Sequence, residues 1–197
     1  MSVKIIYKNI QFKKNLSNLV LFVDEKFNIS GLKKYISSKE YSIISDLFKA
    51  KDLKKKFLTF DISSKRKIIL ISLKKDLKNF EVENLGAKFY EHFKNSIQSE
   101  YHFNSDTITN KLENCLGYFF HGIKLKSYGF DKYKTKKNKK IINLFIHGKK
   151  IPSYENQIRF KAIEEGTFYT RDLVSEPGNV LHPDEYAKRL KSLSKFG

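Results

Sequence analysis

The hydrophobic and polar positions along the chain predict short strands that alternate with helices. Runs rich in β-branched and aromatic residues, bounded by polar residues, are typical of strands. Six such runs are expected to be strands: 3–8, 18–24, 57–62, 67–73, 101–104 and 141–147. The run 67–73, KIILISL, is almost wholly apolar, which indicates burial on both faces of a sheet. A polar SSKR turn joins it to the strand before it.

Apolar residues at helical spacing predict the helices. The segment 79–96 is expected to be an amphipathic helix with Asn79 as its N-cap, and 31–36 begins a short helix or turn. The segment 106–128 is expected to form one long helix. Its apolar stripe consists of Ile108, Leu112, Cys115, Phe119 and Ile123.

Two further helices are predicted near the end of the chain. One spans 153–174 after Pro152, with a stripe made of Ile158, Ala162, Tyr169 and Leu173. The other begins at Pro183, and its apolar side consists of Tyr186, Leu190 and Leu193. Because so short a helix is marginal in water, we expect 184–197 to be mobile or only loosely packed.

This alternation predicts an α/β sandwich around a mostly buried sheet. Lysine becomes sparser near residue 150, where the three prolines of the chain begin (Pro152, Pro177 and Pro183). This shift marks the boundary between a compact domain over 1–150 and a connecting helix.

Composition excludes several classes of protein. No run approaches the ~18 apolar residues of a membrane span. The N-terminal MSVKIIYKNIQF lacks the apolar run and cleavage site of a signal peptide. A single cysteine, Cys115, rules out a framework of intrachain disulfides. We expect a cytoplasmic protein without a membrane partner.

The net charge of +18 raises the question of nucleic-acid binding, because lysines neutralise phosphates. The run 124–140 interleaves lysines with Tyr128, Phe130 and Tyr133, which could stack on bases. The alternative is a compositional bias toward lysine and a solvated loop, which we favour. The candidate nucleic-acid or anion patch consists of Lys124, Lys126, Lys132, Lys134, Lys136, Lys137, Lys139 and Lys140.

No catalytic or metal-binding motif stands out. The five histidines are scattered and never adopt H-x-x-x-H or H-E-x-x-H spacing, so His121 and His147 are interpreted as structural. Cys115 lies on an apolar stripe and is expected to be buried rather than reactive. The acidic pair Asp184 and Glu185 suits the first turn of a helix. Arg171 and Asp172 are expected to make local pairs near a helix end.

Two stretches nevertheless resemble one family. In SYGFDKYKTKK (127–137) and TRDLVSEPGNVLHPDEYAKRL (170–190), the chain is similar to the leucyl aminopeptidases, also called cytosol aminopeptidases. The first motif is matched by Tyr128, Phe130, Asp131, Tyr133 and Lys134. The junction motif is matched by Arg171, Asp172, Leu173, Val174, Pro177, Asn179, Leu181 and Pro183. Gly129, Thr170, Ser175 and His182 depart from the pattern, and His182 weakens the N-cap of the last helix.

The resemblance implies a macro-like three-layer sandwich with a mixed, mostly buried sheet over 1–150. A linker helix over 151–176 and the truncated start of the metallopeptidase catalytic domain over 177–197 follow it. In the family this domain is not catalytic and helps to build a hexamer. The chemistry belongs to a second domain that holds two divalent metals (manganese, zinc or magnesium). Its motifs, Asn-Thr-Asp-Ala-Glu-Gly-Arg and a Gly-Lys-Gly strand, do not occur in these 197 residues.

Three functions therefore remain open. We favour a truncated or split aminopeptidase: a non-catalytic module, inactive alone, that joins a separate catalytic half or self-assembles, or else a remnant. A basic module that binds nucleic acid or a nucleotide-type ligand is the alternative, since some bacterial members of the family bind DNA. A complete aminopeptidase of unusual design is disfavoured, because the metal ligands are missing.

Overall fold

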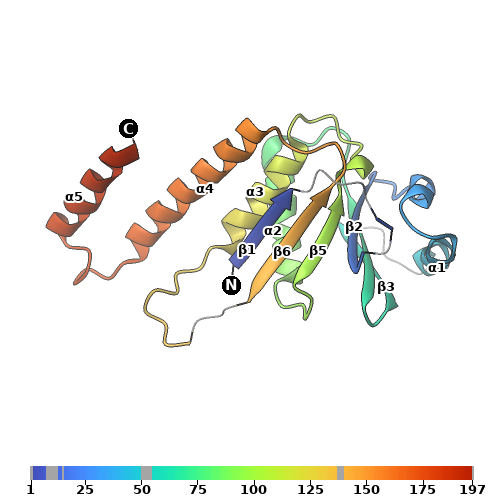
Figure 1. Ribbon diagram of the computed structural model, residues 1–197, viewed down its shortest axis with the longest axis horizontal. Helices are drawn as coiled ribbons and strands as arrows, with labels where there is room; N and C mark the ends of the chain where they lie inside the picture. Colours follow the sequence, from blue (N-terminus) through green and yellow to red (C-terminus); the bar gives the residue numbers. More distant parts are fainter. Residues whose placement is uncertain (1, 8–12, 15, 50–54, 137–139, 197) are drawn as a thin grey trace.

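A six-stranded sheet with helices on both faces forms the body of the protein (Figure 1). The computed structural model describes residues 2–7, 13–14, 16–49, 55–136 and 140–196. The strands are β1 (Ser2–Tyr7), β2 (Asn18–Val23), β3 (Phe57–Ser63), β4 (Arg66–Ser72), β5 (Glu100–Asn104) and β6 (Ile141–His147). The α-helices are α1 (Ser38–Phe48), α2 (Asn79–Phe93), α3 (Cys115–Ser127), α4 (Tyr154–Ser175) and α5 (Pro183–Lys191). Short 3₁₀ helices are η1 (Ser30–Lys34), η2 (Ser105–Thr107) and η3 (Ser192–Phe196).

The sheet is mixed, as predicted. Its strand order is β1-β6-β5-β2-β4-β3, and every neighbouring pair is parallel except the antiparallel hairpin of β3 and β4. All six predicted strands are confirmed to within a residue or so at each end, although Lys8, the last residue predicted for the first strand, lies outside the described residues. In β4 the residues from Ile68 onward are buried, as its apolar sequence indicated.

Two apolar cores lie on opposite faces of the sheet, which confirms the three layers. On one face α2 and α3 pack through aromatic rings, with Phe89 5.4 Å from Phe103 and 5.8 Å from Phe119 between ring centroids. On the other face η1 and α1 place Leu32 and Ile44 over β2 and β4.

Two glycines set the distance between α2 and α3. A Cβ at Gly86 would lie 1.9 Å from the carbonyl oxygen of Phe119, and a Cβ at Gly122 would lie 1.9 Å from that of Glu83. Both distances are far below van der Waals contact with rigid backbone. Glycine at these two positions therefore allows the helix backbones to touch.

The prediction of one helix over 106–128 is wrong in its first part, because α3 begins only at Cys115. Polar side chains hold the preceding segment in other contacts. Thr107 Oγ1 accepts from the Phe22 N–H at 2.9 Å, and Asn110 donates to the Lys74 carbonyl at 2.6 Å. Asn114 then has a left-handed φ of 55° directly before the helix. These side chains bind neighbouring strands and loops instead of continuing a helix.

The helix α1 was not predicted from the apolar pattern. Its signal is a capping box in which Ser37 and Glu40 bind each other's backbone N–H groups. The expectation that Asn79 caps α2 is also wrong, since the N-cap is Lys78 and its N–H donates to Glu81 at 2.8 Å.

The helix α4 has the predicted length but buries a different face. Ile158 is 50% exposed and Ala162 is exposed, whereas Glu164 and Leu173 are buried. The reason is that α4 packs on α3 through Phe160, whose ring fills the space left by Gly117. From there α4 extends beyond the sheet, and α5 follows at its far end (Figure 1). No described helix is long and apolar enough to cross a membrane.

Candidate functional site

The two motif stretches, 127–137 and 170–190, meet where α4 ends. The loop after α3 carries the first stretch, and the last turns of α4 with α5 carry the second. Tyr128 donates its hydroxyl hydrogen to Asp172 Oδ1 at 2.8 Å, which links positions 44 residues apart. The motifs that matter for the resemblance thus form one structural site.

Arg171 holds the Tyr128 ring next to Asp172 through two further contacts. Its Nη1 donates to the Leu125 carbonyl at 2.7 Å, and its guanidinium lies 5.5 Å from the centroid of the Tyr128 ring. Partial burial, and then the Asp172 carboxylate, raise the pKa of Tyr128. The expectation of local pairs is therefore wrong, because both Arg171 and Asp172 bind residues far away in the sequence.

Glu176 is the centre of a second group of contacts, which we call the junction cluster: Lys132, Tyr133, Glu176 and Arg189. Its carboxylate accepts from Lys132 Nζ and the Tyr133 hydroxyl, and from Arg189 Nη1 at 3.0 Å. The side chain of Glu176 is only 1% exposed. Hydrogen bonds from Lys132 and Tyr133, followed by that of Arg189, lower the pKa of Glu176 to about 2.

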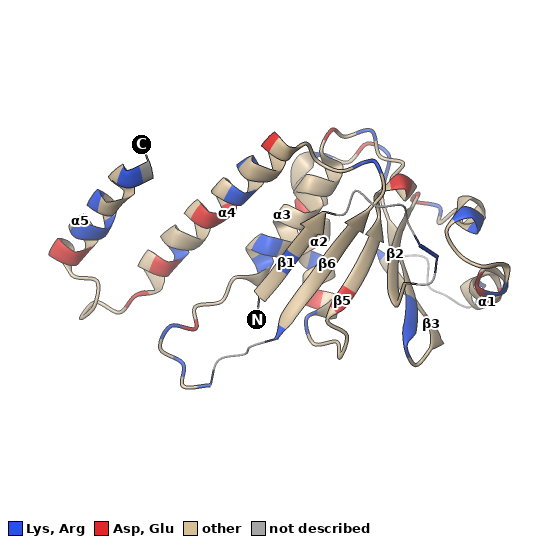
Figure 2. Ribbon diagram, in the orientation of Figure 1, with Lys and Arg blue, Asp and Glu red and all other residues tan. Residues whose placement is uncertain are grey.

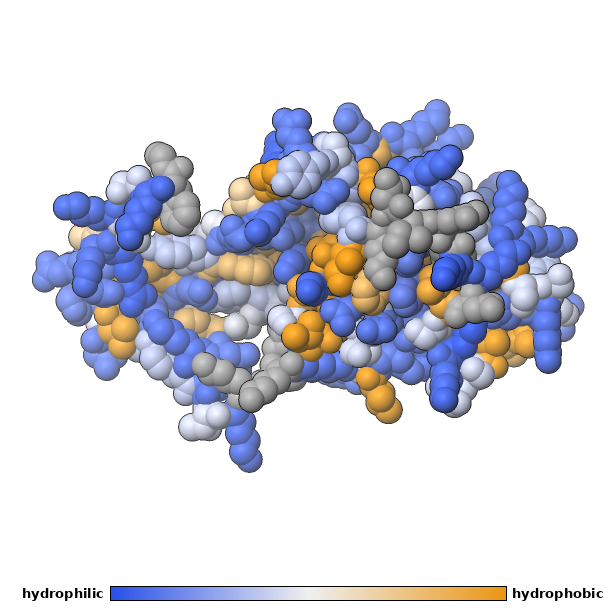
Figure 3. Space-filling view, in the orientation of Figure 1, coloured by the Kyte–Doolittle hydropathy of each residue, from blue (hydrophilic) through white to orange (hydrophobic). Residues whose placement is uncertain are grey.

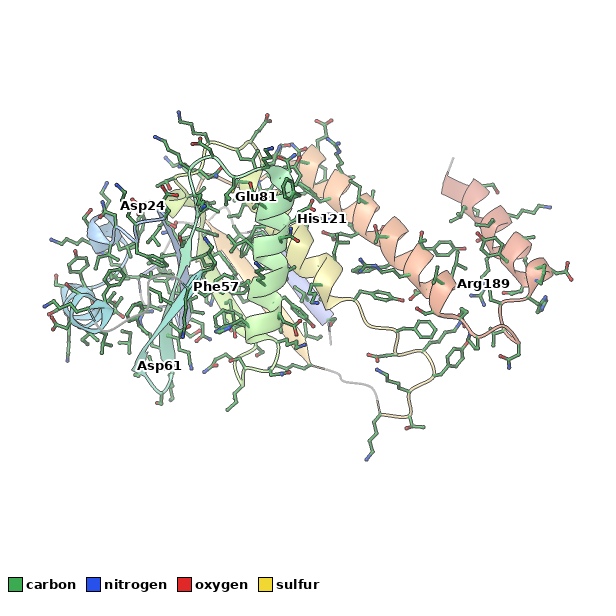
Figure 4. The ribbon with its side chains drawn as sticks, turned by 180° about the vertical axis from the view of Figure 1, so that it is seen from behind. Asp24, Phe57, Asp61, Glu81, His121 and Arg189 are labelled. Carbon is green, nitrogen blue, oxygen red and sulfur yellow. The ribbon has the colours of Figure 1, made fainter. Side chains whose placement is uncertain are left out.

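Arg189 connects the cluster to α5. Its Nε donates to Glu185 Oε1 at 2.9 Å, and its carbonyl accepts from the Tyr169 hydroxyl at 3.0 Å. Figure 4 places Arg189 on α5, near the end of α4. Contacts from the end of α4 and from α5 itself therefore converge on this one arginine, and Glu176 connects it to the 128–134 loop.

The turn between the two helices is built on Pro177. Its carbonyl accepts from the N–H groups of Val180 and Leu181, each at 2.9 Å, while Pro177 and Asn179 themselves are exposed. Pro183 occupies the first turn of α5. His182 is the N-cap residue and makes no side-chain hydrogen bond to the helix, in line with the weak cap predicted for histidine. The predicted apolar side of α5 is exposed: Tyr186 by 44%, Leu190 by 41% and Leu193 by 39%. The mobility of 184–197 stays a prediction.

The candidate lysine patch is mostly engaged with partners inside the protein. Lys124 donates to the Val3 carbonyl at 2.8 Å, and Lys140 donates to the Ser96 carbonyl. Lys126 lies 3.7 Å from Glu91, and Lys134 lies 2.7 Å from Asp131.

Of the remaining patch residues, Lys132 belongs to the junction cluster and Lys136 is exposed. Lys137 and Lys139 lie outside the described residues. Figure 2 shows basic segments in every part of the ribbon, alternating with acidic ones on α4.

The described residues do not fit a two-metal centre. Among them no three His, Cys, Asp or Glu side chains lie close enough together to hold an ion. His121 and Glu164 form a buried pair, with Nδ1 3.2 Å from Oε1, and His102 Nδ1 lies 3.1 Å from His147 Nε2. Cys115 is buried, which raises the pKa of its thiol to about 12.

The contacts of the site therefore fix the orientation of α5. The Glu176 carboxylate binds two cations, Lys132 and Arg189, and the hydroxyl of Tyr133. These contacts define where α5 begins relative to α4 and to the 128–134 loop. The sequence alone assigned no role to Glu176 or to Arg189. The spacing of Glu185 and Arg189 signals their own i,i+4 pair, but no local pattern signals the contacts with Glu176.

The comparisons with known proteins point to one family, although no protein-family profile matches the chain. A probable cytosol aminopeptidase of Sinorhizobium fredii is 38% identical over 87 residues, which are 40% of this chain and 18% of that protein. One from Wolbachia pipientis is 30% identical over 151 residues, which are 72% of this chain and 29% of that protein. The matched stretches thus cover less than a third of the length of these relatives.

Solved structures share the fold over almost the whole chain. A tomato leucine aminopeptidase mutant superposes with a TM-score of 0.73 at 17% identity, covering 99% of this chain and 42% of its own. The cytosol aminopeptidase from Coxiella burnetii gives a TM-score of 0.64 at 13% identity, covering 97% of this chain and 37% of its own. At these identities the likeness concerns the fold.

Proposed function

Since this chain is related to the leucyl aminopeptidases and has the fold of their N-terminal domain, we propose that it is the non-catalytic module of such an enzyme. In this proposal residues 1–150 are the module, 151–176 link it to the catalytic unit, and 177–197 begin that unit. The unit itself holds the two divalent metals and removes N-terminal residues from peptides.

The observation that carries the proposal is the junction cluster. Glu176 joins the motif loop of the first domain to Arg189 of α5, so the module presents α5 in a defined direction. Three large apolar side chains of α5 and the following η3 are left exposed: Tyr186, Leu190 and Leu193. Such a stripe suits a helix whose partner surface belongs to a following unit.

The reading frame beyond the codon for Gly197, and neighbouring frames, test the proposal. We expect them to encode the family's metal-binding motifs, on the same chain or on a separate one. If they lie on a separate chain, coexpression should yield a complex that coelutes in size-exclusion chromatography and hydrolyses leucine amide. Frames without such motifs, or two halves that neither bind nor hydrolyse, would contradict the proposal.

Assembly into homo-oligomers through 1–150 is part of the same proposal. It is supported by the relationship to the family rather than by any contact within the chain. Light scattering of the purified chain measures it directly, with a mass of 23.2 kDa expected for a monomer. A mass that stays monomeric at all concentrations would remove self-assembly from the proposal.

Nucleic-acid binding is the second candidate function. The observation in its favour is that Lys134 is 65% exposed at its side chain and Lys136 lies exposed beside it. Against it, carboxylates already partner Lys126, Lys132 and Lys134. We rank it second for that reason.

A further inference from the structure

A groove of about 410 Å³ separates β1 from α4, and α3 forms its floor. The floor residues Gly117, Phe120, His121 and Lys124 follow helical spacing along one face of α3. Val3, Ile5 and Tyr7 of β1 form one wall. The opposite wall comes from α4 and consists of Gln157, Phe160, Lys161, Glu164, Glu165 and Phe168.

The β1 wall is a free edge of the sheet. Among the described residues, the strand β1 is last in the strand order and pairs with β6 alone. The Ser2 N–H donates to the Lys140 carbonyl, toward β6, and backbone groups of successive residues in a strand point to opposite sides. Val3, Ile5 and Tyr7 therefore direct their N–H and C=O groups into the groove. The Val3 carbonyl confirms this direction, because it accepts from Lys124 at 2.8 Å.

The α4 wall contributes a buried carboxylate. Glu164 is 7% exposed, and its Oε1 accepts from His121 Nδ1 at 3.2 Å. Figure 4 shows His121 where α3 faces α4. Within the described part of the chain, nothing donates to Glu164 Oε2. This second oxygen is open to the groove, where a further donor can reach it. A mostly buried carboxylate gains from such a donor.

Aromatic and apolar side chains surround this carboxylate. The Phe160 ring lies 5.4 Å from the His121 ring, and Tyr7 packs edge-on against Phe120 at 6.5 Å. Burial, and then the charge of Glu164, raise the pKa of Tyr7. The Tyr7 phenol and the Glu164 carboxylate therefore interact electrostatically. Hydrophobic residues also gather over β1 and β6 in the space-filling view (Figure 3).

Three lysines line the groove, Lys4, Lys124 and Lys161, and the last two are already engaged with other groups. Lys124 is bound to the Val3 carbonyl, and Lys161 lies 3.7 Å from Glu165. Neither Lys124 nor Lys161 forms an ion pair with Glu164, whose carboxylate faces the groove beside aromatic rings that favour an ammonium.

We propose that the β1–α4 groove binds the free N-terminus of an extended peptide. The terminal ammonium donates to Glu164, and the first side chain lies among Tyr7, Phe160 and Phe168. The following residues add to the edge of β1 through the backbone groups of Ile5 and Tyr7, as an extra strand. This inference goes beyond the proposed function, because it requires no catalytic segment.

Binding of a fluorescent tetrapeptide, leucyl-threonyl-valyl-threonine amide labelled at its C-terminal end, tests the proposal. The full chain is titrated in the presence of a chelator, so that hydrolysis cannot consume the peptide. We expect the N-acetylated peptide to bind about tenfold more weakly or worse, because it lacks the ammonium. Equal binding of the two forms would overturn the proposal.

Two variants test whether the Glu164 carboxylate causes the difference in affinity between the free and the acetylated peptide. Glu164→Gln should lower the affinity for the free peptide to that of the acetylated one, whereas Glu155→Gln, in the first turn of the same helix and outside the groove lining, should leave it unchanged. Equal effects of the two substitutions would overturn the role of Glu164. If Glu164→Gln melts far below the parent, the acetylation result on the unmodified chain still decides the proposal.

A comparison of the tetrapeptide with leucine amide separates the contribution of the β1 edge from that of Glu164 and its aromatic neighbours. The edge of β1 predicts that the tetrapeptide binds at least tenfold more tightly than leucine amide, since each added backbone hydrogen bond contributes. Equal affinities would show that the strand edge takes no part. Failure of any peptide to bind would leave the proposed function intact, because that function is tested by the catalytic half.

Discussion

The body of the sheet and the junction of α4 with α5 are held together by different forces. The sheet is packed on both faces by apolar side chains such as Phe103, Ile69 and Leu70, each with no exposed surface. The junction depends on charged hydrogen bonds around Glu176, and α5 has no buried residue. Apolar burial tolerates changes of pH and salt, whereas ion pairs do not. The body should therefore persist under conditions that release α5.

The largest effect is expected at the helix contact beneath the sheet. Gly86→Ala and Gly122→Ala each place a Cβ 1.9 Å from a backbone oxygen of the other helix. The helices must move apart, so we expect a loss of at least about 3 kcal/mol in the free energy of unfolding. Urea denaturation followed by circular dichroism measures it.

Gly166→Ala is the matched control. Gly166 lies in α4 with no atom within 4 Å of an added Cβ. Alanine there should stabilise the helix by up to about 1 kcal/mol. If all three substitutions shift the urea midpoint alike, the close approach of α2 and α3 does not set the stability.

A smaller, local effect is expected at the junction. Glu176→Gln removes the charge that Lys132 and Arg189 share, so amides of 183–191 should exchange about tenfold faster. The urea midpoint of the body should hardly change. Glu185→Gln, which removes only the intrahelical partner of Arg189, serves as the control and should have a weaker effect. Unchanged exchange in Glu176→Gln would contradict the role of the cluster.

Acid should release the same contact. The folded pKa of Glu176, about 2, lies below its ordinary value of 4.5, so its contribution to stability is complete above pH 4.5. That contribution is lost as the pH falls through the folded pKa. A carboxyl carbon-13 titration should therefore give Glu176 a midpoint well below 4.5. A midpoint at or above 4.5 would show that the carboxylate is not held by its three donors.

The smallest effect concerns the exposed lysines. If the loop binds DNA, retention should fall steeply with salt, and the double variant Lys134→Gln with Lys136→Gln should lower the slope of log affinity against log salt by about two. Lys33→Gln with Lys34→Gln, in η1 on the other side of the sheet, is the control. Absence of retention at low salt would remove this function.

Much of the fold followed from local sequence patterns. The strands were predicted because β-branched runs such as KIILISL bury both faces of the sheet. The start of α3 was not predicted, because Thr107 and Asn110 bind residues 85 and 36 positions away. A periodic pattern of apolar residues carries no information about such distant contacts. The buried face of α4 was missed for the same reason, since it is decided by Gly117 and His121 on another helix.

The candidate site was predictable only as a set of motifs. The matches at Tyr128 and Asp172 marked both stretches, but nothing local indicated that the two side chains touch. The role of Glu176 likewise depends on Lys132 and Arg189, which only the fold brings together.

Hydrolysis of leucine amide by the full chain tests the central claim most directly. The assay is run with manganese, zinc or magnesium added, against metal-only blanks and a chelator control. Because the described residues offer no converging set of three metal donors, we predict no turnover above the blanks. Robust turnover by residues 1–197 that the chelator abolishes would contradict the claim that this chain is a non-catalytic module.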